Sequence, residues 1–135
     1  DSVKSIGIHA FYRCSSLSQI IIPSSVTSIG KNAFFGIKSL EIQGDIKQIF
    51  NNMFEKCISL RQIKIPDSVT SIGCNAFDGC SALTQITIPN SVTSIGECAF
   101  RGCKSLTEIV IPSSVQSIGS NAFDGCSSLK KNLIQ

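Results

Sequence analysis

The stretch LTQITIPNSVTSIGECAFRGC, from Leu83 to Cys103, decides the fold of this chain because its pattern recurs along the whole sequence. Intact copies of its Ser-Val-x-Ser-Ile-Gly segment begin at Ser2, Ser25, Ser68, Ser91 and Ser114. A degenerate copy, DIKQIF, begins at Asp45. The hydrophobic residue that leads each copy advances in steps of 23, 20, 23, 23 and 23 residues. A period of this length is the signature of a stacked-repeat architecture.

Two further columns keep the same register. A Phe stands eight residues after each leader, at Phe11, Phe34, Phe54, Phe77, Phe100 and Phe123. A Leu follows six residues after each Phe, at Leu17, Leu40, Leu60, Leu83, Leu106 and Leu129. One repeat alone cannot bury its own apolar side, so we predict a solenoid in which six repeats share one continuous core.

Each repeat has the marks of two short strands and two corners. The segment Leu83-x-x-Ile86-x-Ile88 ends in the period-2 alternation of a strand with one buried face. All four prolines, Pro23, Pro66, Pro89 and Pro112, directly follow such a strand, where they end its hydrogen bonding. The Val-x-x-Ile segment that comes next is predicted to bury its apolar side chains from the opposite side of the coil.

The corners are predicted from their Gly and Asn residues. We expect the recurrent glycines to supply a positive φ; they are Gly7, Gly30, Gly73, Gly96 and Gly119. The Asn-Ala-Phe block that follows is predicted to form a single helical turn capped by Asn. His9, the only histidine, and Cys98 replace Asn in their repeats.

One repeat departs from the pattern between residues 36 and 46. It is three residues short, it lacks the proline, and Ile37 replaces a cysteine that recurs in the other repeats. The gap lies either before or after Leu40. We expect a pinched turn that changes the curvature locally.

These blocks closely resemble the BspA-like, or Treponema pallidum-type, leucine-rich repeat, whose pattern is roughly L-x-x-I-x-I-P-x-x-V-x-x-I-G-x-x-A-F-x-x-C. The resemblance covers essentially all 135 residues. It implies a right-handed leucine-rich-repeat coil or horseshoe with a parallel concave β-sheet. It also implies a cell-surface or secreted protein that takes part in adhesion or recognition, with host, matrix or neighbouring-cell proteins as partners. The resemblance supplies no catalytic residue.

Composition agrees with one folded domain over residues 1–135. Hydrophobic residues make up 42% and charged residues 16%, so disorder is not expected. The 12 basic residues are scattered, which gives little reason to expect nucleic-acid binding, and no apolar run is long enough to insert into a membrane. The chain begins at Asp1 without a signal-peptide pattern, so we expect it to be a fragment of a longer array.

Cysteine placement argues for packing rather than for metal or redox chemistry. Five of the seven cysteines each follow a Phe by three residues: Cys14, Cys57, Cys80, Cys103 and Cys126. The spacing offers no close pair for zinc, so we expect no metal or cofactor. Cys74 and Cys98 lie outside this column and are either partly exposed and reactive or simply tolerated. Asp78 and Asp124 share another column, which we interpret as a solvated edge.

An enzyme is not expected, because the chain has one His, one Tyr, no Trp and no clustered acids. Outward-facing positions of the longer strands are the candidate protein-binding surface: Gln19, Ile21, Arg61, Gln62, Lys64, Gln85, Thr87, Glu108 and Val110. Glu41 is expected on the same sheet. A solvated sheet rich in Thr and Gln for their β propensity is the alternative explanation. A second hypothesis is a structural scaffold, since the first repeat would expose an apolar edge that invites end-to-end self-association.

Overall fold

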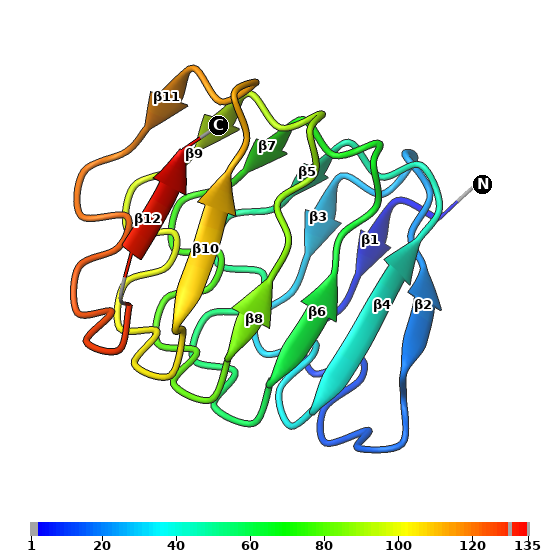
Figure 1. The fold of residues 1–135 in the computed structure, drawn as a ribbon. Coiled ribbons are helices and arrows are strands. Elements are labelled where there is room, and N and C mark those ends of the chain that lie inside the picture. The colour runs from blue at the N-terminus through cyan, green and yellow to red at the C-terminus, as the bar shows by residue number, and fades with distance from the viewer. Residues whose placement is uncertain (1–2, 130, 135) are drawn as a thin grey trace.

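Parallel strands stack in two rows in the computed structural model, which describes residues 3–129 and 131–134 (Figure 1). The front row of Figure 1 holds the strands that follow the Leu positions: β2 (Gln19–Ile21), β4 (Ser39–Gln43), β6 (Gln62–Lys64), β8 (Gln85–Ile86), β10 (Glu108–Ile111) and β12 (Lys131–Ile134). The back row holds the strands of the Ser-Ile segments: β1 (Ser5–Ile6), β3 (Ser28–Ile29), β5 (Gln48–Ile49), β7 (Ser71–Ile72), β9 (Ser94–Ile95) and β11 (Ser117–Ile118). We call these rows the long sheet and the short sheet.

Both rows are parallel, and both are interrupted once. Hydrogen bonds join β2, β4, β6 and β8 in that order, and β10 pairs with β12. In the short sheet β1 pairs with β3, while β5, β7, β9 and β11 form a separate set. The predicted parallel-strand solenoid is confirmed. We number the repeats 1 to 6 from their leading residues, Val3, Val26, Ile46, Val69, Val92 and Val115.

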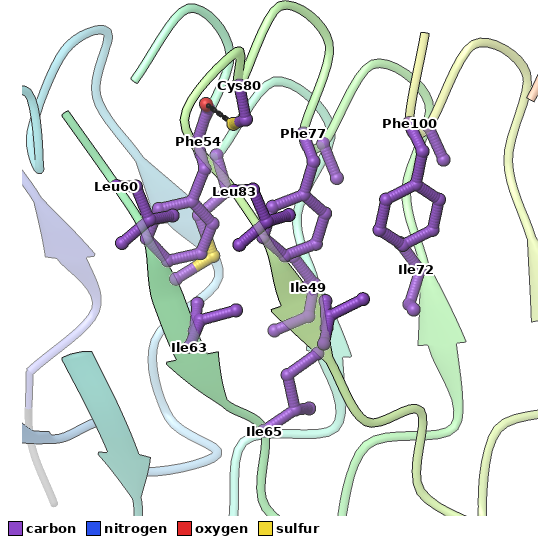
Figure 2. Close-up of a cluster of buried hydrophobic side chains, with 14 of the residues drawn as sticks. Ile49, Phe54, Leu60, Ile63, Ile65, Ile72, Phe77, Cys80, Leu83 and Phe100 are labelled. Carbon is purple, nitrogen blue, oxygen red and sulfur yellow. Dashed lines mark hydrogen bonds between the residues drawn. The ribbon is translucent and has the colours of Figure 1, made fainter. Parts of the chain in front are cut away.

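The core between the two sheets is a set of ladders of like residues (Figure 2). Six Phe rings stack along the solenoid with successive centroids 5.2–5.5 Å apart. The four interior rings are at most 1% exposed, and they are Phe34, Phe54, Phe77 and Phe100. Ile49 and Ile72 of the short sheet belong to the same cluster and are likewise buried. Each repeat thus completes the burial of its neighbours, as the three sequence columns predict.

The predicted helical turns are wrong. Residues 3–129 and 131–134 contain no helix, and so no helix that could cross a membrane. The Asn position adopts the left-handed conformation instead, with φ of 58° at Asn32 and 59° at Asn75. His9 and Cys98, which replace Asn, have the same conformation, with φ of 60° and 56°. Asn and His tolerate this region better than most residues, and this tolerance explains the Asn column.

The predicted role of the recurrent glycines is also wrong. Positive φ falls on other glycines, Gly36, Gly44, Gly79, Gly102 and Gly125, and not on the Ile-Gly column. The column needs Gly because neighbouring repeats approach closely: a Cβ on Gly96 would lie 2.5 Å from the backbone nitrogen of Cys74. Gly7 lies in the first repeat, and a Cβ there would meet nothing within 4 Å. Close approach, rather than a turn conformation, therefore excludes side chains from this column.

The short repeat lacks residues before Leu40 when it is compared with the repeats that follow. Leu40 pairs with Ile63, so it occupies the first Ile position of the strand rather than the Leu column. Ile37 is fully buried and takes the Leu place, three residues after Phe34. With no proline to end it, β4 continues to Gln43 and is the longest described strand. We expected a pinched turn that changes the curvature locally. The structure shows a larger effect, because the short sheet is interrupted between β3 and β5.

The cysteine column is buried where neighbouring repeats cover it. Cys57, Cys80 and Cys103 are at most 2% exposed, Cys126 is half-buried, and Cys14 of the first repeat is exposed. The thiol of Cys80 donates to the carbonyl oxygen of Phe54, 3.0 Å away (Figure 2). Cys98, for which partial exposure was one of two interpretations, is only 8% exposed.

Thiol labelling should follow this pattern. Burial raises the pKa of Cys57 to about 12 and raises the pKa of Cys80 further, so little of either thiol is the reactive thiolate at pH 8. We expect iodoacetamide to label Cys14 and Cys74 first and Cys57 and Cys80 last, measured by mass mapping over time. Labelling of Cys80 before Cys14 would show that the ladder is not packed in solution.

Candidate protein-binding face

The nine candidate residues all lie exposed on or beside the long sheet. Alternation places Gln62 and Lys64 outward and Ile63 inward in β6, and the same pattern holds in β10. Ile21 is 70% exposed and Val110 is 37% exposed, so the two apolar members also face outward. Gln19, Arg61, Gln85, Thr87 and Glu108 are exposed as well. We call this set of nine the long-sheet face.

Register brings several of these side chains side by side. Gln62 pairs with Gln85, and Glu41 pairs with Gln19 on one side and with Lys64 on the other. The Lys64 ammonium lies 4.0 Å from the Glu41 carboxylate. Gln43 donates to the same carboxylate at 3.3 Å. The short repeat therefore contributes Glu41 and Gln43 to this surface. The ambiguous alignment of that repeat concealed Gln43 in the sequence.

Two shallow hollows indent the long sheet. One, of about 350 Å³, is lined by Gln19, Glu41, Gln62, Lys64, Gln85 and Thr87 among others. The second, of about 490 Å³, lies where the sheet divides between β8 and β10 and is lined by Gln85, Thr87, Glu108 and Val110 among others. Gln85 and Thr87 border both hollows and so occupy the centre of the surface. Arg61 and Ile21 lie outside these linings.

The charges on this surface are few and mixed. Arg61 and Lys64 are offset by Glu41 and Glu108, so the surface is polar without a strong field of one sign. Such a surface suits hydrogen bonding with a protein partner better than binding to a polyanion.

Asp78, which we assigned to a solvated edge, is instead buried on the corner side of the solenoid. It is 8% exposed and accepts hydrogen bonds from Arg101 Nη2 at 2.7 Å and Asn75 Nδ2 at 2.8 Å. Arg101 also donates through Nε at 3.2 Å, so the pair is bidentate, and the carboxylate raises the pKa of the guanidinium. The sequence places Arg101 one repeat beyond Asp78 but does not show that their side chains meet. Asp124 is exposed, as predicted.

A solenoid of stacked parallel strands whose repeats carry a Leu-x-x-Ile-x-Ile segment is characteristic of leucine-rich-repeat proteins. The family model for the BspA type leucine rich repeat region matches six copies over residues 1–83 and 47–135, and the chain belongs to this family. No curated protein matches the chain.

Solved bacterial structures show the same fold. A leucine-rich repeat protein from Bacteroides ovatus is 38% identical, with a TM-score of 0.81 over 98% of this chain and 35% of that one. The T. pallidum leucine rich repeat protein is 35% identical, with a TM-score of 0.62 over 96% of this chain and 51% of that one. A leucine rich cell surface protein from Faecalibacterium prausnitzii is 32% identical, with a TM-score of 0.63 over 98% and 43%. This chain thus spans about a third to a half of these proteins.

Proposed function

We propose that this chain is a protein-binding module of a surface or secreted protein and that the long-sheet face holds the partner. The observation that carries the proposal is the outward display of Gln62, Lys64 and Gln85 on the adjacent strands β6 and β8, and of Thr87 directly after β8, while the other face of these strands forms the core. Repeat solenoids characteristically use such extended surfaces for recognition. The cell-surface description of the F. prausnitzii relative supports the proposed location.

We expect substitutions on this surface to change binding without changing the stability of the fold. Truncation of residues at the centre of an interface costs about 2 kcal/mol or more of binding free energy, whereas exposed substitutions change stability by about 0.5 kcal/mol or less. The exposed Lys64–Glu41 pair adds at most about 1 kcal/mol to stability. Charge reversal here should therefore spare the fold and disrupt recognition.

The test uses fluorescently labelled protein and cultured epithelial cells, measured by flow cytometry. We expect saturable binding that is lost when the cells are first treated with trypsin. Lys64→Glu with Thr87→Glu should reduce binding at least tenfold while the unfolding free energy falls by less than about 1 kcal/mol.

The matched control is Lys104→Glu with Ser120→Glu, which makes the same change in net charge at exposed positions outside the long-sheet face. This control should bind as the unaltered protein does. Binding that survives the sheet substitutions, or that trypsin treatment of the cells leaves intact, would contradict the proposal.

A further inference from the structure

Phe50 occupies the one place in the array where the Ile-Gly column has no Gly. It follows Ile49 of β5 as Gly73 follows Ile72 of β7. At Gly30, Gly73, Gly96 and Gly119 an added Cβ would collide with the backbone of the preceding repeat. A Phe in this column therefore cannot be accommodated at normal spacing, and repeats 2 and 3 must separate. Phe50 is partly buried against the core.

The backbone hydrogen bonds show this separation. Every other pair of neighbouring repeats is joined through the Asn and Phe positions, as in Asn75 N to Glu97 O at 2.9 Å and Phe77 N to Ala99 O at 2.7 Å. Within residues 3–129, no backbone hydrogen bond joins residues 26–36 to residues 46–56. The N–H groups of Asn32, Phe34 and Phe50 accordingly lack the backbone partners that their counterparts have.

The gap between repeats 2 and 3 is wedge-shaped and widens from the Phe ladder toward the short sheet. On the inner side, the Phe34 and Phe54 rings remain 5.3 Å apart but are tilted by 34°, against 10° or less for the other pairs of the ladder. On the outer side, no Cα of β3 lies within 8 Å of a Cα of β5. Paired strands are about 4.8 Å apart, and an added strand needs about twice that spacing. We call this opening the seam.

A hollow of about 490 Å³ lies at the end of the seam, between the corners that follow β3 and β5, and both repeats line it. Its residues are Ile29, Lys31, Asn32, Asn51, Asn52, Glu55 and Lys56. Ile29 is only partly buried, whereas Ile72 and Ile95 in the same column are at most 2% exposed. The hollow therefore combines the apolar side chain of Ile29, the unpaired backbone N–H of Asn32, and two lysines against one carboxylate, Glu55, which accepts a hydrogen bond from Asn52 Nδ2 at 2.9 Å.

We propose that the seam is a second binding site, which takes an extended acidic segment of a protein partner as an added strand between β3 and β5. Open strand edges present rows of N–H and C=O groups that pair with an extended chain. An apolar side chain of that segment would pack on Ile29, and flanking carboxylates would pair with Lys31 and Lys56. This site lies away from the long-sheet face and goes beyond the function proposed for it.

The first measurement is amide hydrogen exchange of the unaltered protein, followed by NMR. We expect the amides of Asn32 and Phe34 to exchange at least a hundredfold faster than those of Asn75 and Phe77, which occupy the same positions two repeats later. Equal protection would show that the seam is closed in solution and would overturn the proposal.

The second measurement is titration of the 15N-labelled protein with the capped peptide acetyl-Asp-Ser-Val-Thr-Ser-Ile-Asp-amide. Its central residues repeat the sequence that forms the short-sheet strand in other repeats, and its ends supply carboxylates. We expect saturable shifts at Asn32, Phe34 and Phe50. A version N-methylated at alternate residues keeps the side chains but loses backbone donors, and it should bind at least tenfold more weakly.

Three variants decide whether the peptide occupies the seam. Phe50→Gly should let the repeats close and remove binding. Lys31→Glu with Lys56→Glu should weaken binding at least tenfold, while Lys38→Glu with Lys104→Glu, which makes the same charge change elsewhere, should not. The charge variants remain decisive even if Phe50→Gly fails to fold.

The outcomes also separate this site from the long-sheet face. Lys64→Glu with Thr87→Glu should leave peptide binding unchanged. Three outcomes would overturn the seam proposal: no saturable NMR shift on addition of the peptide, shifts confined to Gln62 and Gln85, or equal weakening of binding by the Lys31/Lys56 and Lys38/Lys104 variants. None of these outcomes bears on recognition by the long-sheet face.

Discussion

Phe100→Ala is expected to lower the free energy of unfolding by about 3–5 kcal/mol, the usual cost of truncating a fully buried Phe. The ring is 0% exposed and lies between Phe77 and Phe123, at centroid distances of 5.2 and 5.4 Å. Its removal breaks the ladder in two and leaves a cavity that neighbouring repeats cannot fill, because their backbones are joined by hydrogen bonds on both sides of it. Chemical denaturation followed by circular dichroism measures the change.

Phe35→Ala is the control for this substitution. Phe35 is the same residue type, but it lies partly exposed outside the core and stacks on Tyr12 at 5.4 Å. Loss of one such aromatic pair is expected to cost about 0.5–1.5 kcal/mol. If Phe100→Ala destabilises the protein no more than Phe35→Ala does, the stacked core described here is incorrect.

The core could be predicted from the sequence because its periodicity and its chemistry point to the same arrangement. A Phe every 23 residues, as at Phe77 and Phe100, must stack if the repeats stack, and the alternation in β6 decides which side chains face outward. Eight of the nine residues of the long-sheet face follow from the same alternation, and the ninth, Arg61, is exposed just before β6. Their exposure can therefore be inferred from the pattern, whereas which of them contribute binding energy depends on a partner that the pattern does not contain.

The corners could not be predicted because two physical requirements select the same small set of residues. Gly satisfies both a positive φ and a close backbone approach, and Asn suits both a helix cap and the left-handed region. In this fold the left-handed residue is Asn75 and the crowded one is Gly96, the reverse of our assignment. Whether a given Gly is needed for its φ or for close backbone approach can be decided only when the position of the neighbouring repeat is known.

In the sequence, the degenerate segment DIKQIF marks the position of the seam. The structural effect of this segment depends on whether the column needs Gly for its φ or for close backbone approach. If Gly were needed for its φ, Phe50 would only distort a corner. Because Gly is needed for close approach, Phe50 instead separates two repeats and interrupts the short sheet. A substitution that tests close approach therefore also tests the cause of the seam.

Gly96→Ala is that substitution, and we expect it to lower the free energy of unfolding by about 3 kcal/mol, toward the upper end of the range for overpacking. The new Cβ would lie 2.5 Å from the nitrogen and 2.9 Å from the Cα of Cys74, both backbone atoms that cannot rotate away. Repeats 4 and 5 would have to separate as repeats 2 and 3 do. Faster amide exchange at Asn75 and Phe77 should therefore accompany the loss of stability.

Gly7→Ala is the matched control, because Gly7 occupies the same column and an added Cβ there meets nothing within 4 Å. Its φ is not in the positive region, so Ala fits without strain. Replacing Gly at such a position reduces the entropy of the unfolded chain, and we expect Gly7→Ala to be neutral or to stabilise the protein by about 0.4–1 kcal/mol. Thermal and chemical denaturation of both variants measure the difference. If φ rather than close approach required Gly in this column, the two variants would be destabilised equally, and the explanation of the seam through Phe50 would fail with it.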